Sequence, residues 1–244
     1  MTAKLYRDEC VVLRTHPLGE ADRIVTLLSR HHGQIRAVAK GVRRTSSRFG
    51  ARLEPFGVVD AQLHRGRSLD TLTQVETIAP YGRSIMADYS LYTCASVVVE
   101  TAAQLTEDLE QAPTEYALVV GALASLATNR HPSGLVVDSF LLRALAVAGW
   151  APSLFECATC GAPGPHAAFD APAGGVLCEA CAPVTAECPS GAALHLLGAL
   201  LSGDWPRAHA APTWARVEAS ELVSGYSQWH LERRLKSLPL LERA

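Results

Sequence analysis

Short runs of apolar residues, each bounded by turn-forming residues, mark the first 80 residues of the chain. Short stretches rich in β-branched and apolar residues are separated by turn-forming residues, and they predict strands at residues 11–15, 23–29, 34–40, 57–64 and 69–78. A longer polar segment, residues 41–55, separates the third strand from the fourth. Five strands in so short a segment predict a small closed barrel of the OB-fold type, with an SH3-like barrel as the alternative.

Beyond residue 80 the apolar positions recur at the period of an α-helix. This pattern predicts helices at residues 84–106, 113–128, 134–148, 192–201 and 214–238. The stretch from about residue 153 to residue 185 lacks the pattern and is rich in Gly and Pro. The chain is therefore expected to be an α+β protein, with an OB-fold at residues 1–80 followed by a helical domain at residues 81–244.

Four cysteines in the irregular stretch form two C-x2-C pairs, Cys157 with Cys160 and Cys178 with Cys181. Each pair can place two thiolates on one metal ion from a tight turn, and Gly161 suits such a turn. Four thiolates leave no open position for water or substrate, so we expect one structural Zn²⁺ rather than a catalytic one. This use of cysteine indicates a reducing compartment.

The chain has seven cysteines, and three lie outside the quartet. Cys10 and Cys94 have apolar neighbours in the sequence, which predicts buried thiols. Cys188 follows the quartet and is not needed to complete a four-ligand set, and His166 between the pairs is a conceivable substitute ligand that nothing demands.

The net charge of −2 hides an asymmetry between the two halves of the chain. Residues 1–80 hold 13 Lys and Arg against 8 Asp and Glu, whereas the remainder holds 9 against 16. The cations gather in residues 40–52, termed the basic loop, at positions Lys40, Arg43, Arg44, Arg48 and Arg52, and the segment also contains Phe49. Such cations can bind phosphates, and an aromatic ring can stack on a base. A solvated surface loop with no ligand would have the same composition and is the alternative.

Sequence signals for catalysis and for membrane insertion are missing. The P-loop, dinucleotide-binding, H-E-x-x-H and G-x-S-x-G patterns do not occur, and no carboxylate pair has a catalytic spacing. The N-terminus does not resemble a signal peptide, and the apolar stretch at residues 117–127 is too short to span a bilayer. We therefore expect a cytoplasmic protein that is not an enzyme.

Three functions remain open on these residues alone. The first is a DNA-binding factor. The second is a protein-interaction adaptor with a zinc-stabilised helical domain and only incidental nucleic-acid binding. The third, a zinc-dependent hydrolase, is disfavoured by the closed ligand set.

Several motifs resemble those of the RecO family of recombination mediators. They are GEADRIVTL at residues 19–27, GQI at 33–35, VAKGVRR at 38–44, SR at 47–48 and LEPF at 53–56. The cysteine quartet and the LKSL motif at residues 235–238 also fit. The family pattern often has a further basic residue near Ser46, which this chain lacks.

The resemblance implies a mediator of recombination in DNA repair and in the SOS response to DNA damage. It implies binding to single- and double-stranded DNA, annealing of complementary strands, and contacts with single-strand-binding protein (SSB) and RecR. Through these it implies help in loading the RecA filament, with association with the nucleoid during repair.

The resemblance also suggests which cations carry these contacts. The matching positions for DNA are Lys40, Arg43, Arg44, Arg48 and Arg52. The SSB tail is acidic and apolar, so a helical groove beside a cation would suit it. Arg130, Arg143 and Arg207 are equally open candidates for that cation.

Overall fold

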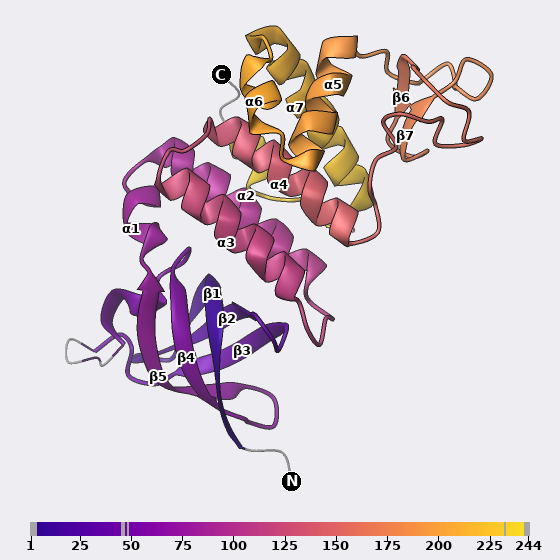
Figure 1. The fold of residues 1–244 in the computed structure, drawn as a ribbon. Helices are drawn as coiled ribbons and strands as arrows, with labels where there is room; N and C mark the ends of the chain where they lie inside the picture. Colours follow the sequence, from indigo (N-terminus) through magenta and orange to yellow (C-terminus); the bar gives the residue numbers. More distant parts are fainter. Residues whose placement is uncertain (1–3, 45–46, 48, 232, 242–244) are drawn as a thin grey trace. The chain divides into compact units, whose positions relative to one another are not determined.

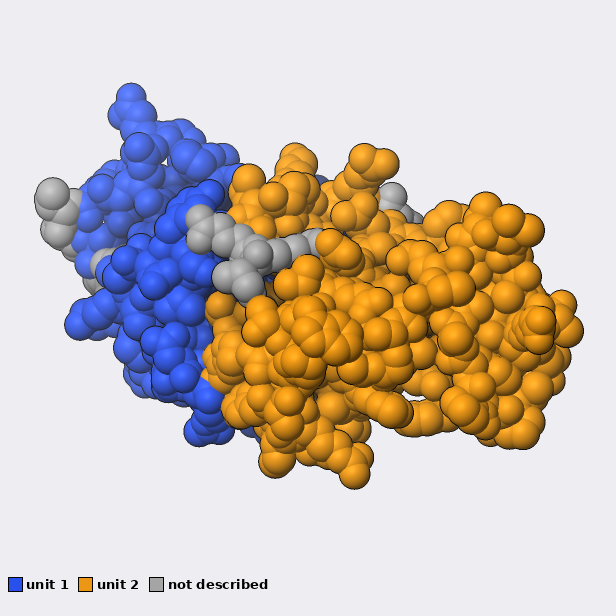
Figure 2. Space-filling model, turned by 90° about the horizontal axis from the view of Figure 1, so that it is seen from above, with its two compact units in different colours: residues 1–130 blue, residues 131–244 orange. Residues whose placement is uncertain are grey.

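The computed structural model describes residues 4–44, 47, 49–231 and 233–241. The chain divides into two compact units, residues 1–130 and 131–244, which are described separately (Figure 2). The described part of the first unit holds the barrel strands and the helices between residues 81 and 127, so these helices belong with the barrel in this division. The sequence places a domain boundary after residue 80, and that boundary stays a prediction.

A closed five-stranded barrel forms the first part of the chain (Figure 1). Its strands are β1 (Leu5–Leu18), β2 (Asp22–Ser29), β3 (Gln34–Ala39), β4 (Val58–His64) and β5 (Asp70–Ala79), and the short 3₁₀ helix η1 (Gly50–Leu53) lies between β3 and β4. The order is β1-β2-β3-β5-β4, closed by antiparallel pairing of β4 with β1 and by a short parallel contact of β3 with β5. The prediction of an OB-like barrel is confirmed.

Strand β1 is longer than the sequence predicted, because its polar residues Arg7, Asp8 and Glu9 obscured the alternation. Its first half pairs with β4 and its second half with β2. The register shifts between Val12 and Arg14, as expected for a bulge that bends a strand around a barrel. The inward residues of the strands, with Phe49 and Leu53, form one buried cluster.

Helices α1 (Tyr81–Ile85), α2 (Tyr89–Leu105) and α3 (Pro113–Ala127) complete the first unit. The single helix predicted at residues 84–106 is wrong, because α1 ends at Ile85 and Asp88 starts a new helix. The Asp88 carboxylate accepts a hydrogen bond from the Leu91 N–H at 3.0 Å, which satisfies one of the amides at the start of α2. Helix α3 begins at Pro113 as predicted.

The described residues of the second unit form a group of helices and a small cysteine-bearing module. The helices are α4 (Ser133–Val147), α5 (Gly191–Ser202), α6 (Trp205–Ala210) and α7 (Thr213–His230), and the module carries strands β6 (Ala168–Asp170) and β7 (Gly175–Leu177). Helix α6 was not predicted, and α7 ends before residue 238 because the backbone is extended at Leu231. Leu235 and Leu238 are then buried, with Leu238 opening the 3₁₀ turn η2 (Leu238–Leu240).

The helices of the described residues are all too short or too polar to cross a membrane.

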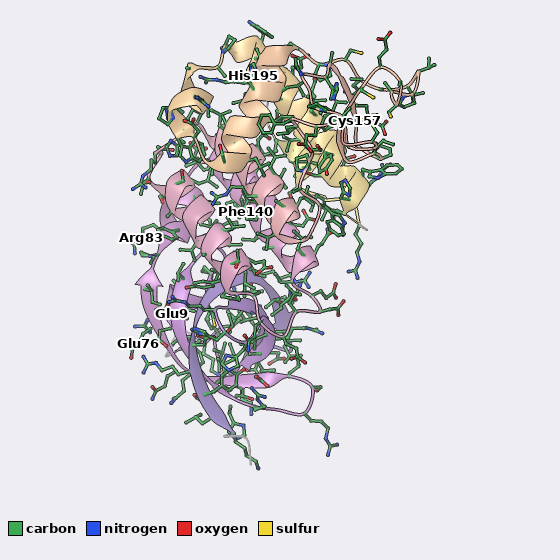
Figure 3. The ribbon with its side chains drawn as sticks, turned by 45° about the vertical axis from the view of Figure 1, so that its right-hand side comes forward. Glu9, Glu76, Arg83, Phe140, Cys157 and His195 are labelled. Atoms are coloured by element: carbon green, nitrogen blue, oxygen red, sulfur yellow. The ribbon has the colours of Figure 1, made fainter. Side chains whose placement is uncertain are left out.

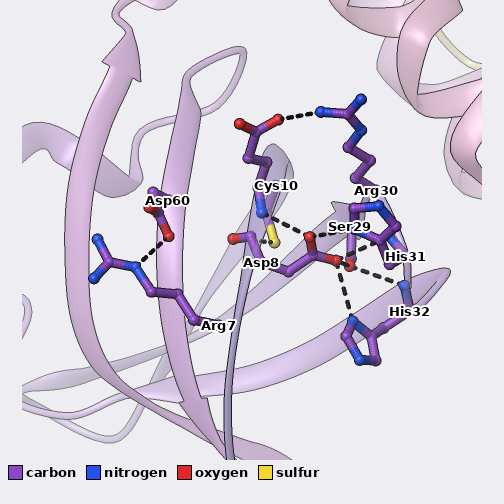
Figure 4. Close-up of polar contacts among 9 residues, drawn as sticks. Arg7, Asp8, Cys10, Ser29, Arg30, His31, His32 and Asp60 are labelled. Atoms are coloured by element: carbon purple, nitrogen blue, oxygen red, sulfur yellow. Dashed lines mark hydrogen bonds and ion pairs between the residues drawn. The ribbon is translucent and has the colours of Figure 1, made fainter.

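A buried carboxylate, Asp8 of β1, holds the turn between β2 and β3 (Figure 4). Its carboxylate accepts hydrogen bonds from the Ser29 hydroxyl and, at 2.9 Å, from the His31 backbone N–H. The carboxylate oxygens also lie 2.8 Å from Nδ1 of His31 and 3.1 Å from Nδ1 of His32. Burial raises the pKa of Asp8, but these hydrogen bonds outweigh it and lower the pKa to about 2. The charged carboxylate is therefore part of the fold.

We expect Asp8→Asn to lower the free energy of unfolding by about 2 kcal/mol at neutral pH. A carboxyl whose pKa is depressed by folding stabilises the protein above its unfolded pKa, and this contribution is lost as the pH falls from about 4 to about 2. Urea unfolding of the variant and of wild-type protein between about pH 4 and pH 2 should show the difference in their free energies of unfolding shrinking toward zero. Asp60→Asn, which removes an exposed ion pair with Arg7, is the control and should cost under ~1 kcal/mol. A difference for Asp8→Asn that does not change with pH would contradict this role of the charge.

Candidate nucleic-acid interface and metal centre

The basic loop leaves the barrel at the end of β3 and is anchored to the turn between β1 and β2. Gly41 adopts a left-handed conformation with φ of 68°, and its N–H donates to the Asp22 carboxylate at 2.7 Å. The Arg43 N–H donates to the Ala21 carbonyl at 3.0 Å, and the Arg43 guanidinium donates to the Gly19 carbonyl at 3.2 Å. The start of the basic loop is thus held in a defined place.

The side chains of Lys40, Arg43 and Arg44 are exposed. None of the three has an ion-pair partner among residues 4–44, 47, 49–231 and 233–241. Arg52 is also exposed, in η1, whereas Arg48 lies outside the described residues. Lys40, Arg43 and Arg44, which no carboxylate of the described residues neutralises, are therefore available to a polyanion.

Phe49 is placed differently from the loop cations. Its side chain is 4% exposed and belongs to the buried cluster of the barrel. The ring is largely covered by the barrel core and has little surface left for stacking on a base. The candidate interface of the basic loop is therefore built from cations and not from a stacking ring.

Two cations that the sequence analysis missed lie on the outer face of the barrel. The register pairs Arg14 of β1 with Thr26 of β2, and Thr26 with Arg36 of β3. Directly paired residues share a face of the sheet, so Arg14 and Arg36 lie on the same face, on either side of Thr26. Arg14 and Arg36 are exposed. The sequence of β3 could have predicted that Arg36 faces outward, because the residues on either side of it in the alternating pattern, Ile35 and Ala37, are apolar and face the core.

The four cysteines of the two C-x2-C pairs come together in the second unit. Their sulfur atoms all lie within 4.8 Å of one another, and the Sγ atoms of Cys160 and Cys178 are 3.8 Å apart. The first pair sits on a turn in which Gly161 has a φ of 72° and its N–H donates to the Cys157 carbonyl at 2.8 Å. In the turn of the second pair, the Cys181 N–H donates a hydrogen bond to the Cys178 carbonyl at 3.0 Å. Strands β6 and β7 lie between the two turns.

This arrangement fits a tetrahedral metal ion. Zn–S bonds of ~2.3 Å in a tetrahedral site require sulfur atoms ~3.8 Å apart. Backbone N–H groups of Cys178 and Cys160 lower the pKa of Cys157 to about 6, which favours the thiolate that a metal binds. A hydrogen bond to the Cys178 side chain instead raises the pKa of Cys181 to about 12, so the four sulfur atoms do not share one protonation behaviour.

The remaining candidates are not brought into the cluster. Cys188 is exposed, and the His166 ring lies 2.9 Å from the Ala162 carbonyl, so neither belongs to the four-sulfur set found among the described residues. Cys10 and Cys94 are buried, as predicted.

Taken together, these features define a protein in which an OB-like barrel with a basic loop is followed by helices and a four-cysteine module. Two family descriptions match the chain: Recombination protein O N terminal over residues 1–81, and Recombination protein O C terminal over residues 86–239. The chain belongs to the RecO family, whose members are recombination proteins of DNA repair.

We expect wild-type protein to contain about one zinc ion per chain and the Cys157→Ser variant to contain much less. The loss of one thiolate should also destabilise the second unit by several kcal/mol, because metal binding is coupled to folding. Elemental analysis and thermal unfolding with and without a chelator would measure both effects. Cys188→Ser is the matched control and should retain the metal and its stability. Normal stability of Cys157→Ser after loss of zinc would contradict a structural role.

Proposed function

We propose that this protein is a non-enzymatic recombination mediator that binds single- and double-stranded DNA and anneals complementary strands, including strands coated with SSB. Together with RecR it helps to load RecA, and it acts at the nucleoid during repair. Family membership supports the setting of this proposal. The observation that carries it is the anchored basic loop, whose exposed cations Lys40 and Arg44 have no ion-pair partner among the described residues.

Annealing needs no bond-making step by the protein. Two polyanions repel each other, so cations that neutralise phosphates reduce the repulsion between strands while leaving the base edges open to pairing. Ser47 and backbone N–H groups of the basic loop can add hydrogen bonds to phosphate oxygens. Contact with SSB would direct this activity to strands that are already coated.

The proposal assigns the four-cysteine cluster to one structural Zn²⁺. Cys157, Cys160, Cys178 and Cys181 would supply all four ligands, which leaves no coordination position for a reacting water. The ion would fix the fold of residues around β6 and β7 and take no part in a chemical step.

The test is annealing of two complementary oligonucleotides, each coated with the cognate SSB, across a salt series without ATP. We expect acceleration that fades with salt. The variant Lys40→Ala/Arg44→Ala should bind a single strand more weakly, with a salt slope that is flatter by about 1.4 for two phosphate contacts.

The control variant Arg7→Ala/Arg30→Ala removes the same charge from the same barrel. Its arginines are already paired with Asp60 and Glu9, at 2.7 and 3.1 Å, and it should keep the wild-type slope. Equal slopes for the loop variant and wild type would remove the loop from the proposed interface. No acceleration by folded, zinc-loaded wild type would favour the protein-interaction adaptor instead.

A cavity of about 740 Å³ in the second unit has the chemistry of a site for the SSB tail. It lies between α5, α6 and the exposed Phe155, its walls are mostly apolar, and Arg207 provides a cation at its edge. Figure 3 labels His195, which also lines it. An acidic and apolar peptide could place side chains in the cavity and a carboxylate on Arg207. Of the three cations left open by the sequence, the cavity favours Arg207 over Arg143 and Arg130.

We expect Arg207→Ala to weaken binding of a synthetic peptide with the tail sequence of the cognate SSB by about tenfold, as for loss of one charge-assisted contact. Fluorescence anisotropy of a labelled peptide would measure this. Arg143→Ala removes an exposed cation that does not line the cavity and should bind the peptide as wild type does. Equal losses in the two variants would indicate general charge attraction rather than this site.

A further inference from the structure

A cavity of about 790 Å³ lies in the first unit, between the segment that ends the basic loop and the segment that carries α1. One wall contains Phe49, Arg52 and Pro55, and the facing wall contains Arg83 and Met86. The label of Arg83 in Figure 3 marks the position of this second wall beside the barrel. The volume lies within the range of ~300–1,000 Å³ that is usual for small-molecule sites.

The charge of the cavity favours an anion. Glu54 is the sole carboxylate among its described lining residues, and it is neutralised by Arg23, whose guanidinium lies 3.0 Å away. The guanidinium of Arg83 is exposed and has no ion-pair partner in the described part of the chain. Arg52 on the other wall is a second cation of the lining, and Pro55, Pro80 and Met86 supply apolar surface beside the polar residues Ser47 and Thr77.

The two walls are joined at a fixed distance. A Cβ atom at Gly82 would lie 2.6 Å from the Pro55 carbonyl oxygen, so α1 approaches this segment as closely as glycine allows. Phe56, which follows Pro55, is buried and has a φ of 70°, a backbone conformation that is rare for an aromatic residue. Its ring packs edge-on against the ring of Tyr92 in α2, with 5.7 Å between the ring centroids. Backbone strain of this kind is tolerated where surrounding packing holds it and often marks a binding site.

We propose that this cavity holds one unstacked nucleotide of single-stranded DNA. Arg83, with Arg52 opposite, binds the phosphate, and the apolar wall at Pro55 and Met86 packs against the base. This inference rests on the proposed function, and it adds α1 to the DNA interface and a preference for single strands.

The preference follows from the shape of the site. A nucleotide enters the cavity only after its base has left the stack, which costs little in a single strand and requires unpairing in a duplex. The basic loop, in contrast, binds phosphates of either form. Loss of the cavity should therefore change affinity for single strands selectively.

The test compares Arg83→Ala with wild-type protein by fluorescence anisotropy, using labelled oligo(dT) and a labelled duplex of equal length. We expect Arg83→Ala to bind oligo(dT) five- to tenfold more weakly, with a salt slope reduced by about 0.7, and to bind the duplex within twofold of wild type. Arg30→Ala, which removes one charge from a paired arginine of the same barrel, should bind both ligands as wild type does.

A second variant, Met86→Ser, keeps every charge and tests the base. Met86 is 46% exposed, so the substitution should not affect folding, which thermal unfolding would verify for each variant. We expect it to weaken oligo(dT) binding severalfold and to leave binding of an abasic strand unchanged.

Equal losses of Arg83→Ala on single strand and duplex, or no loss on either, would overturn the inference. So would an unchanged affinity of Met86→Ser for oligo(dT). These outcomes would leave the proposed function intact as long as Lys40→Ala/Arg44→Ala still weakens binding. Failure of wild-type protein to bind any DNA would overturn both.

Discussion

The barrel closes because one strand, β1, pairs along both of its edges with different partners. The bulge between Val12 and Arg14 bends β1 so that its first half pairs with β4 and its second half with β2. The antiparallel pairing of β2 with β3, in which Arg23 lies opposite Ala39, then places the turn between β1 and β2 at the end where β3 leaves the barrel. This neighbourhood lets Asp22 and the Ala21 carbonyl anchor the start of the basic loop. The position of the proposed DNA interface is therefore set by the register of β2 and β3 within the closed barrel.

The cations of the first unit divide into two groups with different roles. Arg7, Arg23 and Arg30 are paired with carboxylates of other strands or loops, and these contacts support the fold modestly because they are largely solvated. Lys40, Arg44 and Arg83 have no such partner among the described residues, so a phosphate would meet them without first breaking an ion pair. The net charge of the chain, −2, thus hides a local excess of positive charge that remains accessible to an anion in the folded protein.

The barrel and the four-cysteine cluster could be predicted from the sequence because each depends on local pattern. Short apolar stretches between turns predict strands, and C-x2-C spacing predicts two ligands on one turn. Phe49 shows where this reasoning ends: an aromatic residue in a basic segment suggests a stacking group, but this ring belongs to the buried core of the barrel. The break at Asp88 and the cavity beside Arg83 depend on contacts between segments that no local pattern records.

The four-cysteine cluster is connected to the proposed SSB site rather than to the proposed DNA interface. Phe155 precedes Cys157 by two positions and lines the cavity between α5 and α6, where a Cβ atom at Gly198 would lie 3.6 Å from its ring. Its side chain is 75% exposed, so packing alone does not hold it in place, whereas the Cys157 side chain is buried in the cluster next to it. A metal that fixes Cys157 therefore fixes the backbone from which Phe155 reaches α5. The basic loop and the cavity beside Arg83 take all their described residues from the first unit. A metal bound by the four cysteines would therefore stabilise one wall of the proposed SSB site, whereas the proposed DNA interface draws on the barrel.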